Sequence, residues 1–167
     1  MPRTIRRIVT GHDSNGMAVI RSDQSLPLEP IAPGAADFVK IWTTGSSPAD
    51  PNDATDGAAR ASGLTMPGGT VLRVVDQPPG SRSRMHRTQS VDYAICLEGR
   101  LDMETDSGET VKLKQGDILV QMGTNHAWVN PYSEPARMAY ILIDAKPVLI
   151  DGKPLEEVGH NVAPSHL

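Results

Sequence analysis

The sequence predicts an all-β protein built as a sandwich or a barrel, and three observations lead to this fold class. Short runs rich in β-branched and aliphatic residues recur along the chain, with turn-forming residues between them. The 15 Gly and 14 Pro residues are spread widely rather than gathered in one linker. No long stretch shows the hydrophobic spacing of an amphipathic helix. The length of 167 residues is typical of one domain with its own core.

Elements of the first half are expected at three places. Residues 6–11 and 17–23 read as two strands, and the turn at 12–16 contains an Asn-Gly pair that suits a hairpin. A third strand is expected at 37–45. Residues 46–63 are small, polar and rich in Pro and Gly, so they predict a surface loop or a lid whose role the sequence does not define.

The second half shows tighter strand patterns and ends in an irregular tail. In 110–114, Val111 and Leu113 alternate with lysines, which is typical of a half-exposed strand. One helical turn is expected at 155–158. The strands predicted in this half cover 70–76, 91–99, 100–106, 110–114, 116–122, 126–130 and 136–144.

Composition and charge exclude several classes of protein. The formal net charge is −4, and the short basic cluster of Arg82, Arg84 and Arg87 is no broad basic face, so no nucleic-acid partner is expected. Cys96 is the single cysteine, which rules out an intrachain disulfide. Neither a signal peptide nor an apolar run of membrane-spanning length is evident, so a cytoplasmic protein without a membrane partner is expected.

Two spaced motifs carry the chemistry. The first reads Gly80-x5-His86-x-Thr88-x3-Asp92-x6-Gly99. The second reads GDILVQMGTNHAWVN and runs from Gly116 through Met122 and His126 to Asn130, as the printed sequence shows.

These motifs resemble the pair that defines the cupin superfamily, in particular its small single-domain bacterial and fungal members. The cupin motifs have the forms G-x5-H-x-H-x3-E-x6-G and G-x5-P-x-G-x2-H-x3-N. The first is matched at every spacing, with Thr88 in place of the second His and Asp92 in place of Glu. In the second, Met122 replaces Pro, and the interval from Gly to His is one residue shorter. The metal motif is therefore degenerate.

The resemblance implies a jelly-roll β-barrel, or double-stranded β-helix, with extra N-terminal strands, and a chain that is often a homodimer. One structural domain is expected, in which residues 1–69 supply strands and a loop that pack on the barrel. Residues 70–145 form the barrel core and residues 146–167 form a C-terminal tail.

The same resemblance brings His86, Asp92 and His126 together inside the mouth of the barrel. Two imidazoles and one carboxylate suit Fe(II) with open positions, or a catalytic Zn(II), and Mn or Ni are alternatives. Two other readings stay open: Asp92 accepts a hydrogen bond from His86 instead of binding the ion, or the histidines are ordinary interior residues. Thr88 supports a bound water or leaves its coordination position empty.

Five residues are expected to line a small-molecule pocket: Thr88, Trp128, Arg73, Tyr140 and Cys96. Core packing is the alternative for the two aromatic residues, and a buried, unreactive thiol is the alternative for Cys96. Arg73 is either a rim charge or a clamp for a carboxylate.

The function expected from these residues is metal-dependent chemistry on a small organic molecule, of the dioxygenase, isomerase, decarboxylase or dehydratase type. The alternative is a small-molecule-binding cupin that has neither metal nor catalysis. Fold alone does not choose between them.

Overall fold

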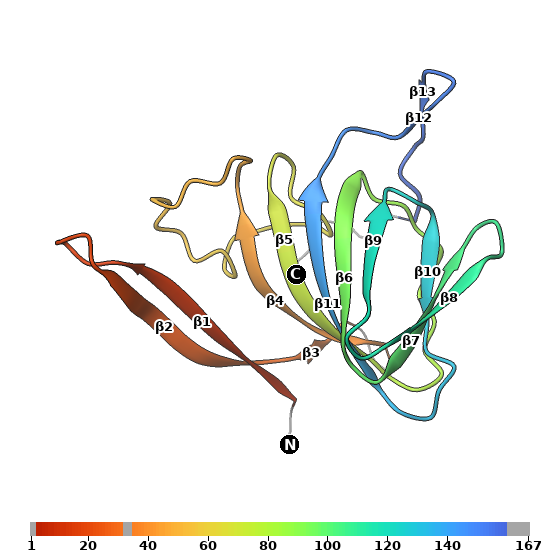
Figure 1. Cartoon of the computed structure of the whole chain (residues 1–167), viewed down its shortest axis with the longest axis horizontal. Helices are drawn as coiled ribbons and strands as arrows, with labels where there is room; N and C mark the ends of the chain where they lie inside the picture. Colours follow the sequence, from red (N-terminus) through yellow and green to blue (C-terminus); the bar gives the residue numbers. More distant parts are fainter. Residues whose placement is uncertain (1–2, 32–34, 160–167) are drawn as a thin grey trace.

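The computed structural model describes residues 3–31 and 35–159. Its first element is a hairpin in which β1 (Thr4–His12) pairs antiparallel with β2 (Ala18–Pro27). The backbone N–H of Gly16 donates to the Asp13 carbonyl at 3.1 Å, and Gly16 has a φ of 79°, which a residue without Cβ adopts freely. The hairpin predicted around this turn is confirmed. In Figure 1 it extends away from the rest of the molecule.

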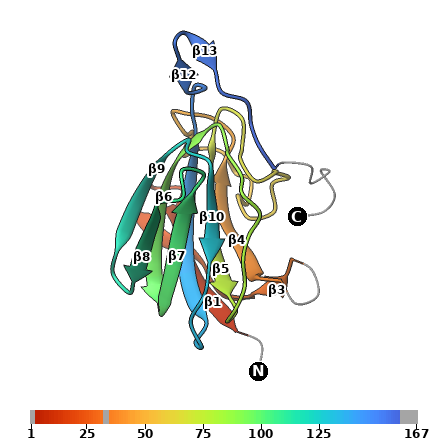
Figure 2. The same ribbon diagram turned by 90° about the vertical axis from the view of Figure 1, so that its right-hand side faces the viewer.

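Two antiparallel sheets form the body of the protein and face each other (Figures 1 and 2). The larger sheet has the strand order β3-β4-β5-β11-β6-β9, and the smaller has the order β10-β7-β8. The larger sheet contains β3 (Glu29–Pro30), β4 (Asp37–Thr44), β5 (Thr70–Gln77), β11 (Ala136–Asp144), β6 (Ser90–Glu98) and β9 (Ile118–Met122). The smaller contains β7 (Arg100–Thr105), β8 (Thr110–Lys114) and β10 (His126–Val129). This confirms the predicted all-β jelly-roll class with extra N-terminal strands.

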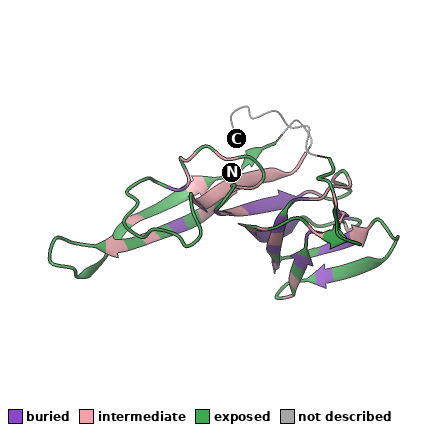
Figure 3. Cartoon of the chain, turned by 90° about the horizontal axis from the view of Figure 1, so that it is seen from above, coloured by how far each residue is buried: buried purple, intermediate pink, exposed green. Residues whose placement is uncertain are grey.

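The core fills the space between the two sheets, because inward side chains alternate with outward ones along each strand. On β6, for example, Asp92, Ala94 and Cys96 are buried while Tyr93 is exposed. Figure 3 shows the buried residues gathered in the barrel strands, whereas the β1–β2 hairpin is mostly exposed or intermediate. The principal hydrophobic cluster is Val71, Val75, Ala94, Cys96, Leu101, Met103, Leu113, Trp128, Ala136, Met138, Tyr140 and Leu142.

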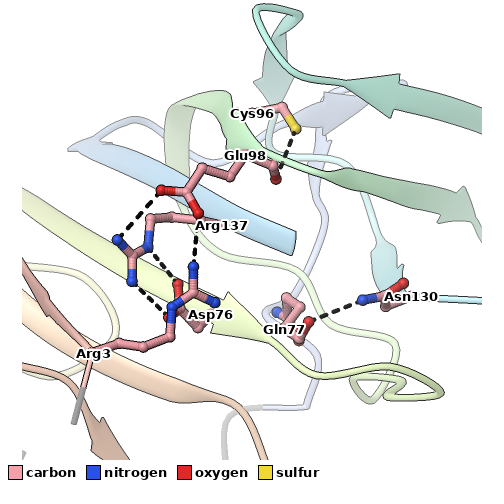
Figure 4. A network of polar contacts seen from close by, with 7 residues as sticks. All are labelled: Arg3, Asp76, Gln77, Cys96, Glu98, Asn130 and Arg137. Carbon is pink, nitrogen blue, oxygen red and sulfur yellow. Dashed lines mark hydrogen bonds and ion pairs between the residues drawn. The ribbon is translucent and has the colours of Figure 1, made fainter. Parts of the chain in front are cut away.

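An ion-pair network with a buried centre joins Arg3, the residue before β1, to the end of the barrel (Figure 4). Arg137 on β11 forms two hydrogen bonds to Asp76 on β5, of 2.6 and 2.8 Å. Arg3 bridges Asp76 at 3.0 Å and Glu98 at 2.7 Å. The network therefore holds the segment before β1 against two strands of the larger sheet.

The loop at 46–63 contains turns and bends but no helix or strand. It is attached to neighbouring strands at several points, and Thr43 donates to the carbonyl of Gly57 at 2.7 Å. Arg7 bonds both carboxylate oxygens of Asp56, at 2.8 and 3.0 Å, and Lys40 donates to the carbonyl of Arg60. Within the described residues no helix is long and apolar enough to cross a membrane.

The helical turn expected at 155–158 is wrong. The tail instead contains a small hairpin of β12 (Leu149–Ile150) and β13 (Lys153–Pro154). Residues 155–157 have no regular structure, and Val158 forms an isolated antiparallel bridge with Arg87. The spacing of Leu155 and Val158 suits a helix turn, but pairing with a distant segment decided the local conformation.

Candidate functional site

A cavity of about 470 Å³ opens between the two sheets. This volume is within the range of about 300–1,000 Å³ that is usual for small-molecule pockets. Its walls come from β5, β6, β10 and β11, from the segment before β6, and from residues on both sides of the 46–63 loop. The lining residues are Ile31, Ala35, Ala36, Leu64, Arg73, Val75, Gln77, Ser81, Arg82, Ser83, His86, Thr88, Asp92, His126, Trp128, Tyr140 and Leu142.

The two motif histidines meet on one wall of this cavity. His86 and His126 form an antiparallel bridge in which each backbone N–H donates to the other's carbonyl, at 2.8 and 2.9 Å. Their ring centroids are 4.2 Å apart and the rings are tilted by 47°. This bridge pairs the segment of the first motif with β10. It explains why residues forty positions apart in the chain are neighbours.

Each of these rings contacts a carbonyl two residues earlier in the chain. Nδ1 of His86 lies 2.9 Å from the Arg84 oxygen, and Nδ1 of His126 lies 3.1 Å from the Thr124 oxygen. In the neutral ring this contact places the proton on Nδ1 and the lone pair on Nε2, the tautomer found in many metal-ligating histidines. Burial, reinforced by the neighbouring His86, lowers the pKa of His126 to about 4. At neutral pH the His126 ring is therefore uncharged.

Asp92 lines the same cavity from β6. Its side chain is 6% exposed, and its Oδ2 accepts a hydrogen bond of 3.2 Å from Nε2 of Gln121. Its Oδ1 is buried and has no hydrogen-bond partner among the described residues. Burial raises the pKa of Asp92 to about 6, and the positive charge of Arg73 offsets only part of this effect.

The three residues predicted as metal ligands are not all brought into one cluster. Among residues 3–31 and 35–159, no group of three or more His, Cys, Asp or Glu side chains is arranged to hold a metal ion. The structure brings His86 and His126 together and places Asp92 on the wall of the same cavity. Thr88, which replaces a histidine in the motif, is buried there and accepts a 2.8 Å hydrogen bond from Ser90.

Arg73 and Tyr140 occupy neighbouring positions on β5 and β11, where their Cα atoms are direct partners in the register. Nη2 of Arg73 contacts the carbonyls of Leu64 and Gly63, and its buried Nε has no partner among the described residues. The hydroxyl of Tyr140 is likewise buried; it forms no hydrogen bond of normal geometry among the described residues, although the side chain of Gln77 interacts with it. Burial lowers the pKa of Arg73 to about 10 and raises the pKa of Tyr140.

Aromatic rings form a continuous wall beside the histidines. Trp128 meets His126 edge-on, with centroids 5.5 Å apart, and packs against Tyr140 at 5.1 Å. Cys96, in contrast, is not among the residues that line the cavity. Its side chain is buried in the core cluster, and its Sγ lies 3.6 Å from the carbonyl of Gly99.

Sequence reasoning did not find two polar residues of this region. Gln77 lines the cavity two residues beyond Val75 on β5, and Gln121 binds Asp92 from β9. The alternation along β5 places Gln77 on the face of Arg73, so this signal was available in the sequence. The pairing of Gln121 with Asp92 depends on the β6–β9 register, in which these two residues are direct partners.

Fold and cavity together define a jelly-roll barrel with paired histidines at its mouth, and comparisons with known proteins agree with this class. The family model described as "Cupin domain" matches residues 73–143. The Schizosaccharomyces pombe Cnp3 cupin domain superposes with a TM-score of 0.53 at 12% identity, covering 83% of this chain and 87% of that one. At this identity the likeness concerns the fold alone.

Two fungal relatives are similar over most of their length. Phomopsin biosynthesis cluster protein C' of Diaporthe leptostromiformis is 41% identical over 160 residues, which are 90% of this chain and 84% of that protein. Cupin-domain-containing oxidoreductase srdB of Neurospora crassa is 35% identical over 154 residues, 90% of this chain and 79% of its own. The chain belongs to the cupin superfamily, as its two motifs predicted.

Proposed function

We propose that this cupin is an enzyme of the oxidoreductase type that acts on a small organic molecule bound in the cavity and uses a divalent metal ion. The observation that carries the proposal is the His86–His126 pair on the cavity wall. The relatives named cupin-domain-containing oxidoreductases support the reaction class. The aromatic wall beside the pair supports an apolar or aromatic substrate.

The residues present fit a divalent ion in their donor chemistry. Neutral imidazoles are suitable ligands for Fe, Zn, Mn and Ni, and the lowered pKa of His126 keeps its ring neutral near pH 7. A buried carboxylate oxygen without a partner, as on Asp92, is stabilised by a nearby cation. We propose that His86 and His126 bind the ion, and Asp92 stays the predicted third ligand.

A bound ion would polarise a substrate oxygen or activate water or dioxygen. The chain's own residues supply the rest. The carbonyls of Arg84 and Thr124 orient the two imidazoles through Nδ1. Trp128 and Tyr140 exclude water from one side of the cavity. If Asp92 is not a ligand, its pKa of about 6 in the metal-free chain would let it take up or release a proton near neutral pH.

Metal content measured on protein purified without an affinity tag tests this function. About one ion per chain is expected in the wild type, and loss of the ion is expected in both His86→Ala and His126→Ala. Gln89→Ala, an exposed position within the first motif, serves as the matched control. Asp92→Asn decides the third ligand: loss of the ion makes Asp92 a ligand, and retention leaves it a cavity residue.

A second candidate function is a binding protein without metal or catalysis. It is favoured by the lack of a three-ligand cluster among the described side chains. In that case the wild type contains no ion above the level of the histidine variants, yet a small molecule still binds in the cavity.

We also propose the homodimer that the resemblance implies. Support comes from apolar side chains on the outward face of β6 and β9, where Ile118, Val120 and Met122 are exposed beside Tyr93. The double variant Ile118→Lys, Val120→Lys is expected to sediment as a monomer. Val111→Lys, an exposed valine on the opposite sheet, is the control and should leave sedimentation unchanged.

A further inference from the structure

The Arg73–Tyr140 pair is a feature of the cavity that binding of an ion by the histidines does not explain. In the β5–β11 register the two residues are direct partners, and both side chains lie on the cavity side of the larger sheet. Directly opposed residues in an antiparallel pair have Cβ atoms about 4.5–5.5 Å apart. Their polar groups can therefore reach the same ligand atom.

Both residues present buried donors that have no hydrogen bond of normal geometry among the described residues, although the side chain of Gln77 interacts with the Tyr140 hydroxyl. These are the Nε–H of Arg73 and the O–H of Tyr140, whose side chain is 8% exposed. A buried polar group without a hydrogen bond costs roughly 1–3 kcal/mol, so two of them at one place indicate a missing acceptor. Burial also keeps the phenol protonated and hence a donor.

The setting of Arg73 limits what that acceptor is. Its Nη2 is occupied by the main-chain carbonyls of Gly63 and Leu64, so the guanidinium does not offer a free two-pronged face to a carboxylate. One N–H and one O–H match the two lone pairs of a single oxygen. The carboxylate of Asp92 also interacts electrostatically with Arg73. Its negative charge would repel the carboxylate of a ligand bound beside it.

We propose that Arg73 Nε and Tyr140 Oη form a two-donor subsite for one carbonyl or enol oxygen of the molecule bound in the cavity. The subsite rests on the proposed function only in using the same cavity, and it does not require the metal ion. It assigns the ligand class as a ketone, an aldehyde or an enol rather than a carboxylic acid. The aromatic wall of Trp128 then packs against the carbon skeleton.

Probe binding to metal-free protein tests this subsite. The three probes are acetophenone, which has a carbonyl oxygen, ethylbenzene, which has the same ring but no oxygen, and benzoate. Binding is followed by tryptophan fluorescence and by the carbonyl ¹³C resonance of labelled acetophenone. Wild type is expected to bind acetophenone more tightly than the other two, and to shift its carbonyl resonance as hydrogen bonds to that oxygen do.

Tyr140→Phe removes one donor and little else. We expect acetophenone binding to weaken about 5- to 15-fold, the effect of one hydrogen bond, while ethylbenzene binding changes little. Arg73→Met is expected to abolish the preference for the ketone. Tyr93→Phe, which changes an exposed tyrosine on the outer face of β6, is the matched control. Tyr140→Phe should fold at least as stably as the wild type, because it deletes an unpaired buried hydroxyl.

Two outcomes would overturn the subsite. One is equal loss of acetophenone and ethylbenzene binding in Tyr140→Phe, and the other is benzoate binding more tightly than acetophenone in the wild type. The metal measurement is independent of both. If the protein prefers the ketone but contains no ion, the subsite is supported and the metal enzyme is refuted. If the histidines bind an ion but the protein does not prefer the ketone, the metal site is supported and the subsite is refuted.

Discussion

Arg137 and Asp76 form a two-pronged ion pair between β11 and β5, with both side chains less than 10% exposed. A buried pair of this kind couples two strands, and removing one partner leaves an uncompensated charge in the interior. Asp76 also forms an ion pair with Arg3, so the loss of Asp76 and the loss of Arg137 are not equivalent. This asymmetry makes the pair a test of the packing at this end of the barrel.

Asp76→Ala is expected to lower the free energy of unfolding by about 3–5 kcal/mol, since it leaves Arg137 with only the more distant Glu98. Arg137→Ala should cost less, because Arg3 still neutralises Asp76. Urea unfolding measures both. The exposed pair of Arg6 and Asp23 supplies the control, and Arg6→Ala should change stability by less than about 1 kcal/mol. Equal costs for Asp76→Ala and Arg6→Ala would contradict this account.

Opposite pH effects are expected from His126 and Asp92 in the metal-free protein. The folded pKa of His126 is about 4, below its ordinary 6.5, so its contribution to stability is complete above 6.5 and is lost as the pH falls toward 4. The folded pKa of Asp92 is about 6, above its ordinary 3.8. Its contribution is complete below 3.8 and is lost as the pH rises toward 6. The two effects should nearly cancel between pH 4 and 6.5.

Asp92→Asn removes one of these opposing effects. The variant is expected to gain stability as the pH rises from 4 to 6.5, by up to about 3 kcal/mol, and to exceed the wild type at pH 7 by about 1–3 kcal/mol. Urea unfolding at pH 4.5, 5.5 and 7 measures this, with the exposed Glu29→Gln as the control. A variant with the same flat profile as the wild type would show that Asp92 is not buried in its charged form.

Gly99 closes the first motif at a position that no other residue suits. It has a φ of 74°, and a Cβ there would lie 2.5 Å from the carbonyl oxygen of Pro135. Gly108 has a φ of 89° with open space around it. Gly108→Ala is thus expected to cost about 1–2 kcal/mol for the backbone conformation alone, and Gly99→Ala clearly more. Thermal unfolding of the two variants compares them, and equal shifts would rule out the clash.

The thiol of Cys96 is expected to be unreactive in the folded protein. It is 1% exposed, and burial raises its pKa, which disfavours the nucleophilic thiolate. Reaction with a chromogenic disulfide reagent should therefore be slow in buffer and fast in urea, with a single thiol per chain. Rapid labelling under native conditions would indicate that the core around Cys96 opens easily.

Most of the barrel could be predicted because the strands between 70 and 144 are short β-rich runs separated by turn residues. The two-residue strands β3, β12 and β13 could not, since two residues carry no periodicity. The motif spacing anticipated that His86 and His126 meet. Their relation to Asp92 depends on strand register and side-chain reach, and Gln121, which occupies its Oδ2, lies 29 positions away in the chain. The sequence predicted that Arg73 lines the pocket. Its hydrogen bonds to the carbonyls of Gly63 and Leu64 could not be predicted, because they depend on how the chain folds.

The anchoring of Arg73 by main-chain carbonyls has a consequence for how related chains diverge. Carbonyl oxygens are supplied by every residue type, so the stretch around Gly63 and Leu64 can exchange its side chains without disturbing the guanidinium. An insertion or deletion between 46 and 64 would move those oxygens and release the arginine. The side chains of this segment can thus vary, whereas its length determines where Arg73 lies in the cavity.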